Sequence, residues 1–192
     1  MAIILVKSSY SQELDLEKKV ISEVIKVEAN SILTDTINFG ILKNPHNDIN
    51  TTLQTRALIF LRIKDEFKPQ LHLWYFYDQN LNEPKGLLYN WGLFNPSFNP
   101  SKNRDLLESL TKQEDEFTKK FEEQKTLISD LLGEPSEVRI IEDSKSKLVK
   151  QVLWISNEKI VQLSIEFMRE LNEIPGIGIL GDFHIQIMTT YR

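Results

Sequence analysis

The feature that most constrains the fold is a series of short segments in which apolar and polar residues alternate. Residues 56–64 and 160–168 show the pattern most clearly, and a period of two is typical of a strand with one buried face. Short turns such as 143–147 and 156–158 join neighbouring segments of this kind. Strands that follow one another through short turns pair antiparallel, so the sequence favours antiparallel sheet.

Helical periodicity is confined to two parts of the chain. Residues 12–29 place apolar side chains on one side at about 100° per residue, and residues 101–132 predict a short helix followed by a longer one. Thr111 and Glu114 have the spacing of a capping box, and Gly133 with Pro135 predicts the end of the long helix. The expected strands are 56–64, 71–78, 87–91, 136–142, 148–155, 160–168 and 183–191, with a further candidate at 36–42.

Together these elements predict an α+β fold. An antiparallel sheet, or two, of about seven strands is packed by an N-terminal helix and a central helical pair. We expect a single domain over residues 1–192. The pattern leaves open two subdomains, namely 1–100 as a helix with a β-meander and 101–192 as a helical pair with four strands.

Composition excludes several classes of function. The chain has no cysteine, which removes disulfides, thiol nucleophiles and thiolate metal sites. Its net charge is −5 and its Lys and Arg form no continuous stripe, so we expect no nucleic-acid partner. No apolar run approaches the roughly 18–20 residues of a membrane span.

Residues 1–11 admit two interpretations. The apolar run Ala2–Val6, followed by Ser9-Tyr10-Ser11, has features of the remnant of a signal peptide. The alternative is a strand at Ala2–Val6. The first interpretation predicts a periplasmic or secreted protein, and the second a cytoplasmic one.

Motifs that carry catalysis are missing or out of context. Gly176-x-Gly178-x-x-Gly181 has the form of a dinucleotide motif, but a strand pattern and not a helix follows it. The three histidines do not pair at metal-ligand spacing, and no serine stands in a nucleophile elbow. We therefore predict no catalytic residue, no cofactor and no metal.

A few polar residues stand out from their surroundings. Glu17 and Glu28 fall within the apolar arc of the predicted first helix, near its ends, where each carboxylate is expected to reach water. His72 and His184 alternate with apolar residues on predicted strands, which indicates solvent-facing or rim positions. Only a cleft that joined such a carboxylate to such a histidine would favour an enzyme.

Aromatic residues form the most informative candidate surface. The strand at 71–77 carries bulky side chains on both faces, so it is either central in a covered sheet or presents one face to a partner. Trp and Tyr are favoured anchors of interfaces. The candidate binding residues are Trp74, Tyr75, Tyr77, Trp91, Phe94 and Phe98.

One stretch resembles known envelope modules. The long helix ends in Leu131-Leu-Gly-Glu-Pro135, a hairpin carries Trp154, and strands Ile160–Ile165 and His184–Ile187 follow. This layout over residues 111–191 resembles SmpA/OmlA-type lipoproteins and the β-lactamase-inhibitor-protein fold. The resemblance implies a protein-binding sheet without catalysis, although the lipoprotein cysteine is absent.

Three functions remain as hypotheses. The first is a non-enzymatic module, extracytoplasmic under the signal-peptide interpretation, that binds a protein or peptide on a sheet face. The second is an acidic inhibitor or immunity-type protein that blocks a basic partner. The third is an enzyme with a carboxylate and histidine cleft. The acids behind the second hypothesis are Glu114, Asp115, Glu116, Glu122 and Glu123.

Overall fold

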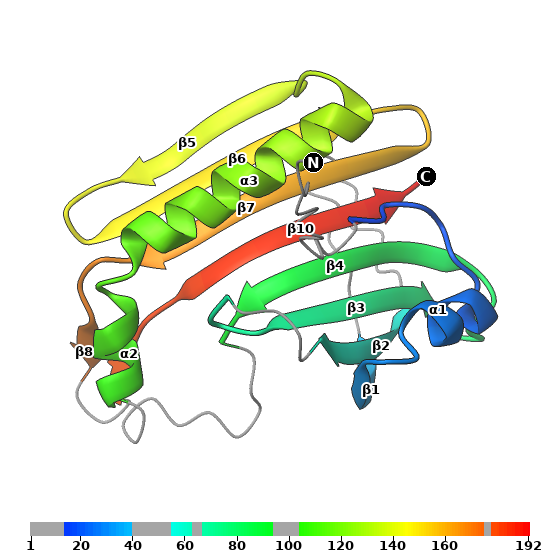
Figure 1. Ribbon diagram of the computed structural model, residues 1–192, viewed down its shortest axis with the longest axis horizontal. Helices are drawn as coiled ribbons and strands as arrows, with labels where there is room; N and C mark the ends of the chain where they lie inside the picture. The colour runs from blue at the N-terminus through cyan, green and yellow to red at the C-terminus, as the bar shows by residue number, and fades with distance from the viewer. Residues whose placement is uncertain (1–13, 40–54, 63–66, 94–103, 175–177) are drawn as a thin grey trace, which may run out of the picture.

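The protein is built on one antiparallel sheet of eight strands with helices on one face (Figure 1). The computed structural model describes residues 14–39, 55–62, 67–93, 104–174 and 178–192. The strand order is β1-β2-β3-β4-β10-β7-β6-β5, and every neighbouring pair is antiparallel. The predicted α+β class is confirmed, and the eight described strands agree roughly with the seven or so expected, since β1 overlaps the further candidate at 36–42.

The element bounds are close to those predicted for most of the sheet. The helices are α1 (Ile21–Val27), α2 (Arg104–Leu110) and α3 (Glu114–Leu132). The strands are β1 (Ile32–Phe39), β2 (Thr55–Arg62), β3 (Leu71–Asp78), β4 (Pro84–Gly92), β5 (Glu137–Asp143), β6 (Lys147–Ile155), β7 (Lys159–Met168), β8 (Asn172–Ile174), β9 (Gly178–Leu180) and β10 (Phe183–Tyr191). Within the described residues, no helix is both long enough and apolar enough to cross a membrane.

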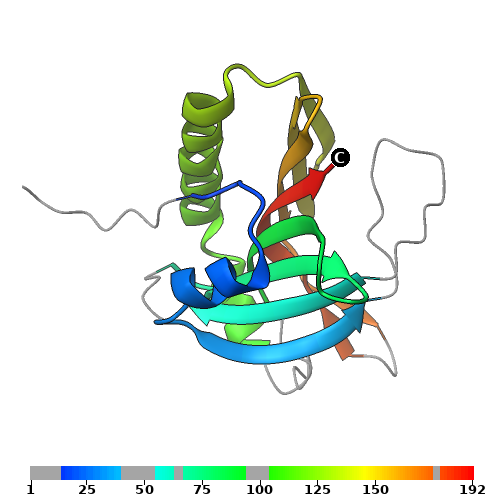
Figure 2. The same ribbon diagram turned by 90° about the vertical axis from the view of Figure 1, so that its right-hand side faces the viewer.

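Strand β10 joins two parts of the chain that are distant in sequence. It pairs with β7 on one side and with β4 on the other, so β1–β4, which precede α2, and β5–β7, which follow α3, form one sheet. Figure 2 shows that this sheet is strongly twisted, with β1–β3 crossing the direction of β5–β7.

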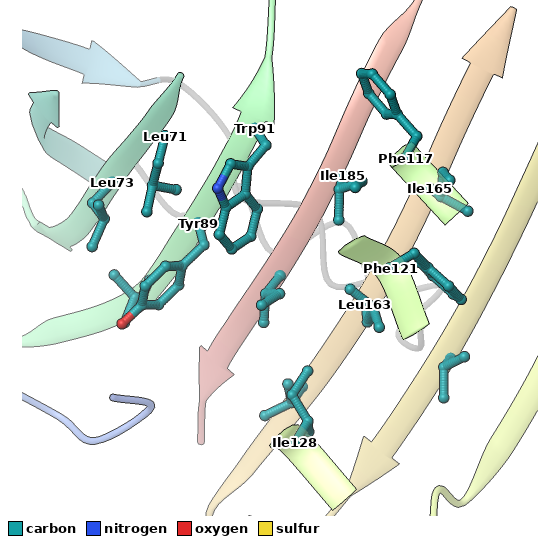
Figure 3. Packing of buried hydrophobic residues seen from close by; sticks show 14 of the residues in the cluster. Leu71, Leu73, Tyr89, Trp91, Phe117, Phe121, Ile128, Leu163, Ile165 and Ile185 are labelled. Atoms are coloured by element: carbon teal, nitrogen blue, oxygen red, sulfur yellow. The ribbon is translucent and has the colours of Figure 1, made fainter. Parts of the chain in front are cut away.

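The main core lies between α3 and the sheet (Figure 3). We call the side that bears Leu163, Ile165 and Ile185 the helix-covered face, because Phe117, Phe121 and Ile128 of α3 pack there. Leu16 and Val24 belong to the same buried cluster, so α1 and the segment before it cover the face near β3 and β4. A smaller cluster on the opposite face contains Ala57, Ile59, Trp74, Phe76 and Leu88.

The helix predicted over residues 12–29 is mostly absent, and this prediction was wrong. Among its described residues, 14–29, only Ile21–Val27 is helical, and residues 14–20 are not. The apolar stripe is partly real, since Leu16 and Val24 are buried. However, Val20, Ile25 and Val27 are each about half exposed. The backbone groups that a longer helix would pair internally are instead bound by side chains of the sheet.

The start of α3 also differs from the prediction. Thr111 does not cap the helix, because its hydroxyl donates to the Glu108 carbonyl of the preceding turn at 2.8 Å. Gln113 is the N-cap residue, and its side chain makes no capping hydrogen bond; its Nε2 bonds to Ser109 instead. The predicted end is confirmed, since Gly133 adopts a φ of 85° there, a conformation that glycine takes without strain.

The glycine-containing segment after β7 forms part of a small second sheet. Strands β8 and β9 pair antiparallel where a loop was predicted, and the strand β10 follows, so no helix opens after these glycines. Several predictions lie outside the described residues: the segment 1–11, and the side chains of Phe94 and Phe98 in the candidate surface.

Candidate functional site

The four residues of the predicted aromatic surface that the structure describes lie inside the protein. β3 is an interior strand between β2 and β4, and it carries buried side chains on both faces. Trp74, Tyr75, Tyr77 and Trp91 are only 4%, 6%, 1% and 2% exposed. These four side chains therefore act as core residues and are not accessible to a partner in this structure.

On the helix-covered face, tyrosine hydroxyls bind the chain's own N-terminal segment. Burial raises the pKa of Tyr77 and of Tyr89 to about 12, so these hydroxyls keep their protons and can donate. The Tyr77 hydroxyl donates to the Lys19 carbonyl at 2.8 Å, and the Tyr191 hydroxyl donates to the Glu17 carbonyl at 2.8 Å. The Tyr89 hydroxyl donates to the Asp15 carbonyl at 3.0 Å and accepts from the Asp15 N–H at 3.1 Å. We call residues 14–20 the tyrosine-bound segment.

Replacing Tyr77 by Phe should loosen the tyrosine-bound segment. The change removes one hydrogen bond and leaves the Lys19 carbonyl without that donor, which typically costs about 1 kcal/mol of unfolding free energy. Hydrogen exchange should accelerate in residues 14–20, while amides of β6 serve as the internal control. Unchanged exchange in that segment would show that Tyr77 does not hold it.

Glu28 is the most buried carboxylate that the sequence singled out. It is 3% exposed, so the expectation that it reaches water was wrong. Arg62 donates two hydrogen bonds to it, at 2.6 and 3.1 Å, and Tyr75 and Ser31 donate one each at 2.8 and 2.7 Å. Burial acts to raise the pKa of Glu28, but the contacts with Arg62 and Ser31 outweigh it and hold the pKa below its ordinary value. The cluster fastens the end of α1 to β2 and β3.

Glu17 behaves differently. Its side chain is 75% exposed and forms an ion pair with Lys159 of β7 at 2.6 Å. Because residues 14–20 are not helical, Glu17 does not lie in the first turn of a helix. Glu17 reaches water as predicted, and its partner comes from the sheet.

The predicted histidines lie on the opposite face of the sheet from Glu28. His72 pairs in register with Asn90, and His184 pairs with Glu166 and with Gly92. Burial lowers the pKa of His72. The sheet thus separates both histidines from the Glu28 cluster, and the four polar residues do not share one cleft.

His184 lies beside two carboxylates, Glu166 across the pairing of β10 with β7 and Asp182 two residues earlier in the chain. Its Nδ1 lies 2.9 Å from Asp182 Oδ1, and its Nε2 lies 3.8 Å from Glu166 Oε2. Lys147 forms an ion pair with the other oxygen of Glu166. Sequence spacing among histidines alone did not reveal this cluster, because Glu166 reaches it across the pairing of β7 with β10.

One of the acids in α3 has a structural partner. Arg169 donates two hydrogen bonds to Glu114, at 2.5 and 2.9 Å, and a third to Asp143 at 2.8 Å. These bonds tie the start of α3 to the end of β5. Glu114 is therefore less suited to recognising a basic partner than the other acids of this helix.

The strand β5 lies at the edge of the sheet (Figure 1), and it exposes apolar side chains. Val138, Ile140 and Ile141 are 58%, 65% and 57% exposed. Val138 pairs with buried Val152, which places Val138 and, two residues on, Ile140 on the helix-covered face. The strand was predicted from the sequence, but its exposure was not; the signal for it is a short apolar run flanked by charged residues.

Comparison of the chain with protein-family models, with curated proteins and with solved structures finds no match.

Proposed function

We propose that this chain is a non-enzymatic protein-binding module that receives an extended segment of a partner beside β5. The observation that carries the proposal is the exposure of three large aliphatic side chains on one edge strand. Such an edge favours pairing with another chain. The bound segment would add a ninth strand to the sheet by backbone hydrogen bonding.

Two contributions would make the free energy of binding a partner segment favourable. Among the described strands β5 pairs only with β6, so a partner strand can form a new ladder of hydrogen bonds along its outer edge. Full burial of a Val or Ile side chain is worth about 1.5–3 kcal/mol, so partial burial of three contributes several kcal/mol. The β-hairpin of β5 and β6 presents these groups on a rigid sheet.

The two faces of β5 specify the chemistry of the partner. Val138 and Ile140 lie on the helix-covered face, whereas Glu137 and Arg139 lie on the other face and bond to each other at 2.5 and 2.7 Å. The pairing register shifts between Ile140 and Glu142, which marks a bulge at Ile141. The fitting partner is an extended segment with apolar residues at alternate positions and polar residues between them.

The test uses displayed linear nine-residue peptides in which every second position is Val, Ile, Leu or Phe. Peptides selected on the immobilised chain should protect the β5 amides from hydrogen exchange. Ile140→Lys should weaken their binding at least tenfold, because a charge replaces the most exposed aliphatic residue. Leu131→Lys is the matched control, since Leu131 is 58% exposed but lies on α3.

Other outcomes would overturn the proposal. No selectable peptide, or equal binding by the Ile140→Lys variant, would remove β5 as the site. Concentration-dependent dimerisation that Ile140→Lys abolishes would assign the edge to a second copy instead. Binding that survives Ile140→Lys but is lost on neutralising Asp115, Glu116 and Glu123 would favour the acidic-inhibitor function.

A further inference from the structure

The cluster around His184 combines three groups that bind metal ions. Glu166 and His184 stand directly opposite each other on β7 and β10, which lie side by side in Figure 1. Asp182 lies just before β10, two residues from His184. One ligand atom from each of the three residues lies within 4.8 Å of the other two.

The side chains are fixed yet reachable from solvent. His184 and Glu166 are 17% and 23% exposed, and Asp182 is 58% exposed. Gly92 stands beside His184 in the neighbouring strand, and a Cβ atom there would come within 2.9 Å of the His184 Cβ. The absence of a side chain at Gly92 therefore leaves room for His184 at this place in the sheet.

The charges of the cluster favour a cation. Ligand oxygens of Asp182 and Glu166 lie within 4.8 Å of each other, and two carboxylates this close attract a positive ion. Lys147 binds Oε1 of Glu166 and leaves Oε2 on the side of His184.

We propose that Glu166, Asp182 and His184 form a binding site for a divalent transition metal of the zinc type. An imidazole with two carboxylates suits Zn²⁺, whereas Mg²⁺ prefers oxygen ligands alone. Three protein ligands leave a fourth position for water. The ion would link β7 to β10 on the face of the sheet opposite α3.

The test is a calorimetric titration of the full chain with ZnCl₂, with MgCl₂ as a comparison. One Zn²⁺ should bind per chain and Mg²⁺ should bind far more weakly. His184→Ala and Asp182→Asn should each weaken the affinity for Zn²⁺ by about tenfold or more. Glu170→Gln is the matched control, because this exposed acid lies near the site in sequence but outside the cluster.

A nuclear magnetic resonance titration of the unmodified chain tests Zn²⁺ binding without relying on variants that fold correctly. The chain has three histidines, so imidazole resonances can be followed one by one as ZnCl₂ is added. Shifts at His184 without shifts at His72 support the site. Absence of binding at millimolar Zn²⁺, shifts confined to another histidine, or unchanged affinity in His184→Ala would overturn it. The β5 proposal is independent of this result.

Discussion

Replacing Glu28 by Ala should lower the free energy of unfolding by about 3–5 kcal/mol, the usual cost of breaking a buried ion pair. The Glu28 side chain is 1% exposed and that of Arg62 is 17% exposed. The substitution leaves the guanidinium in place without its anion, and the hydroxyls of Tyr75 and Ser31 lose their acceptor. Denaturant unfolding measures the effect.

Glu17→Ala is the matched control for this prediction. Glu17 also forms an ion pair, with Lys159, but it is 75% exposed, so its loss should change stability by less than about 1 kcal/mol. Equal effects of the two substitutions would contradict the assignment of Glu28 as the anchor of α1.

The contribution of Glu28 should also depend on pH. Its pKa in the folded protein is lower than the ordinary value of 4.5, so folding favours the charged form. The associated stability is fully present above about pH 4.5 and is lost as the pH falls through the folded pKa. The difference in stability between the unmodified chain and Glu28→Gln should therefore shrink below about pH 4.5.

Replacing Phe117 by Ala should destabilise the protein by about 3–5 kcal/mol, the range for removing a fully buried phenylalanine. Phe117 is 0% exposed, and its ring contacts those of Phe67, Phe167 and Phe183 at centroid distances of 5.1, 5.2 and 6.4 Å. It joins the first turns of α3 to β7 and β10 (Figure 3).

Leu131→Ala, on the same helix, tests whether the effect of Phe117→Ala comes from burial. Leu131 is 58% exposed, so its truncation should change the free energy of unfolding by no more than about 0.5 kcal/mol. Thermal unfolding of both variants measures the difference. A loss below about 1 kcal/mol for Phe117→Ala would show that α3 does not depend on this contact.

Elements with a local pattern were predictable from the sequence. β7 was expected at 160–168 and spans Lys159–Met168, and the long helix ends at Leu132 as expected. In both cases the periodicity of apolar residues and the flanking turn residues agree with the final packing. Local signals are sufficient where tertiary contacts do not compete with them.

The segment before α1 could not be predicted in this way. Its apolar spacing indicates a helix, but its backbone is bound by hydroxyls 58 to 174 residues away. A single sequence does not reveal such distant partners. The same reason explains why Glu28 was expected to reach water, since Arg62 and Tyr75 meet it only after the sheet has formed.

The candidate sites depend on pairing as well. The composition of β3 left open whether its aromatics were core or surface, and its place between β2 and β4 makes them core. Val138 and Ile140 are exposed because β5 lies at the edge of the sheet. The sequence of the strand alone does not show that it would lie there. The group around His184 depends on the register between β7 and β10.

The pairing of β4 with β10 has a consequence for how the chain folds. Gly86 pairs with Thr190, so roughly 100 residues separate partners that must meet before the sheet is continuous, and such distant contacts slow folding. During synthesis, β1–β4 emerge long before β10, and the edge of β4 must wait for its neighbour. Exposed strand edges in such an interval promote association with other chains. Aggregation of nascent or truncated chains is therefore expected at β4, even though this strand is interior in the finished protein.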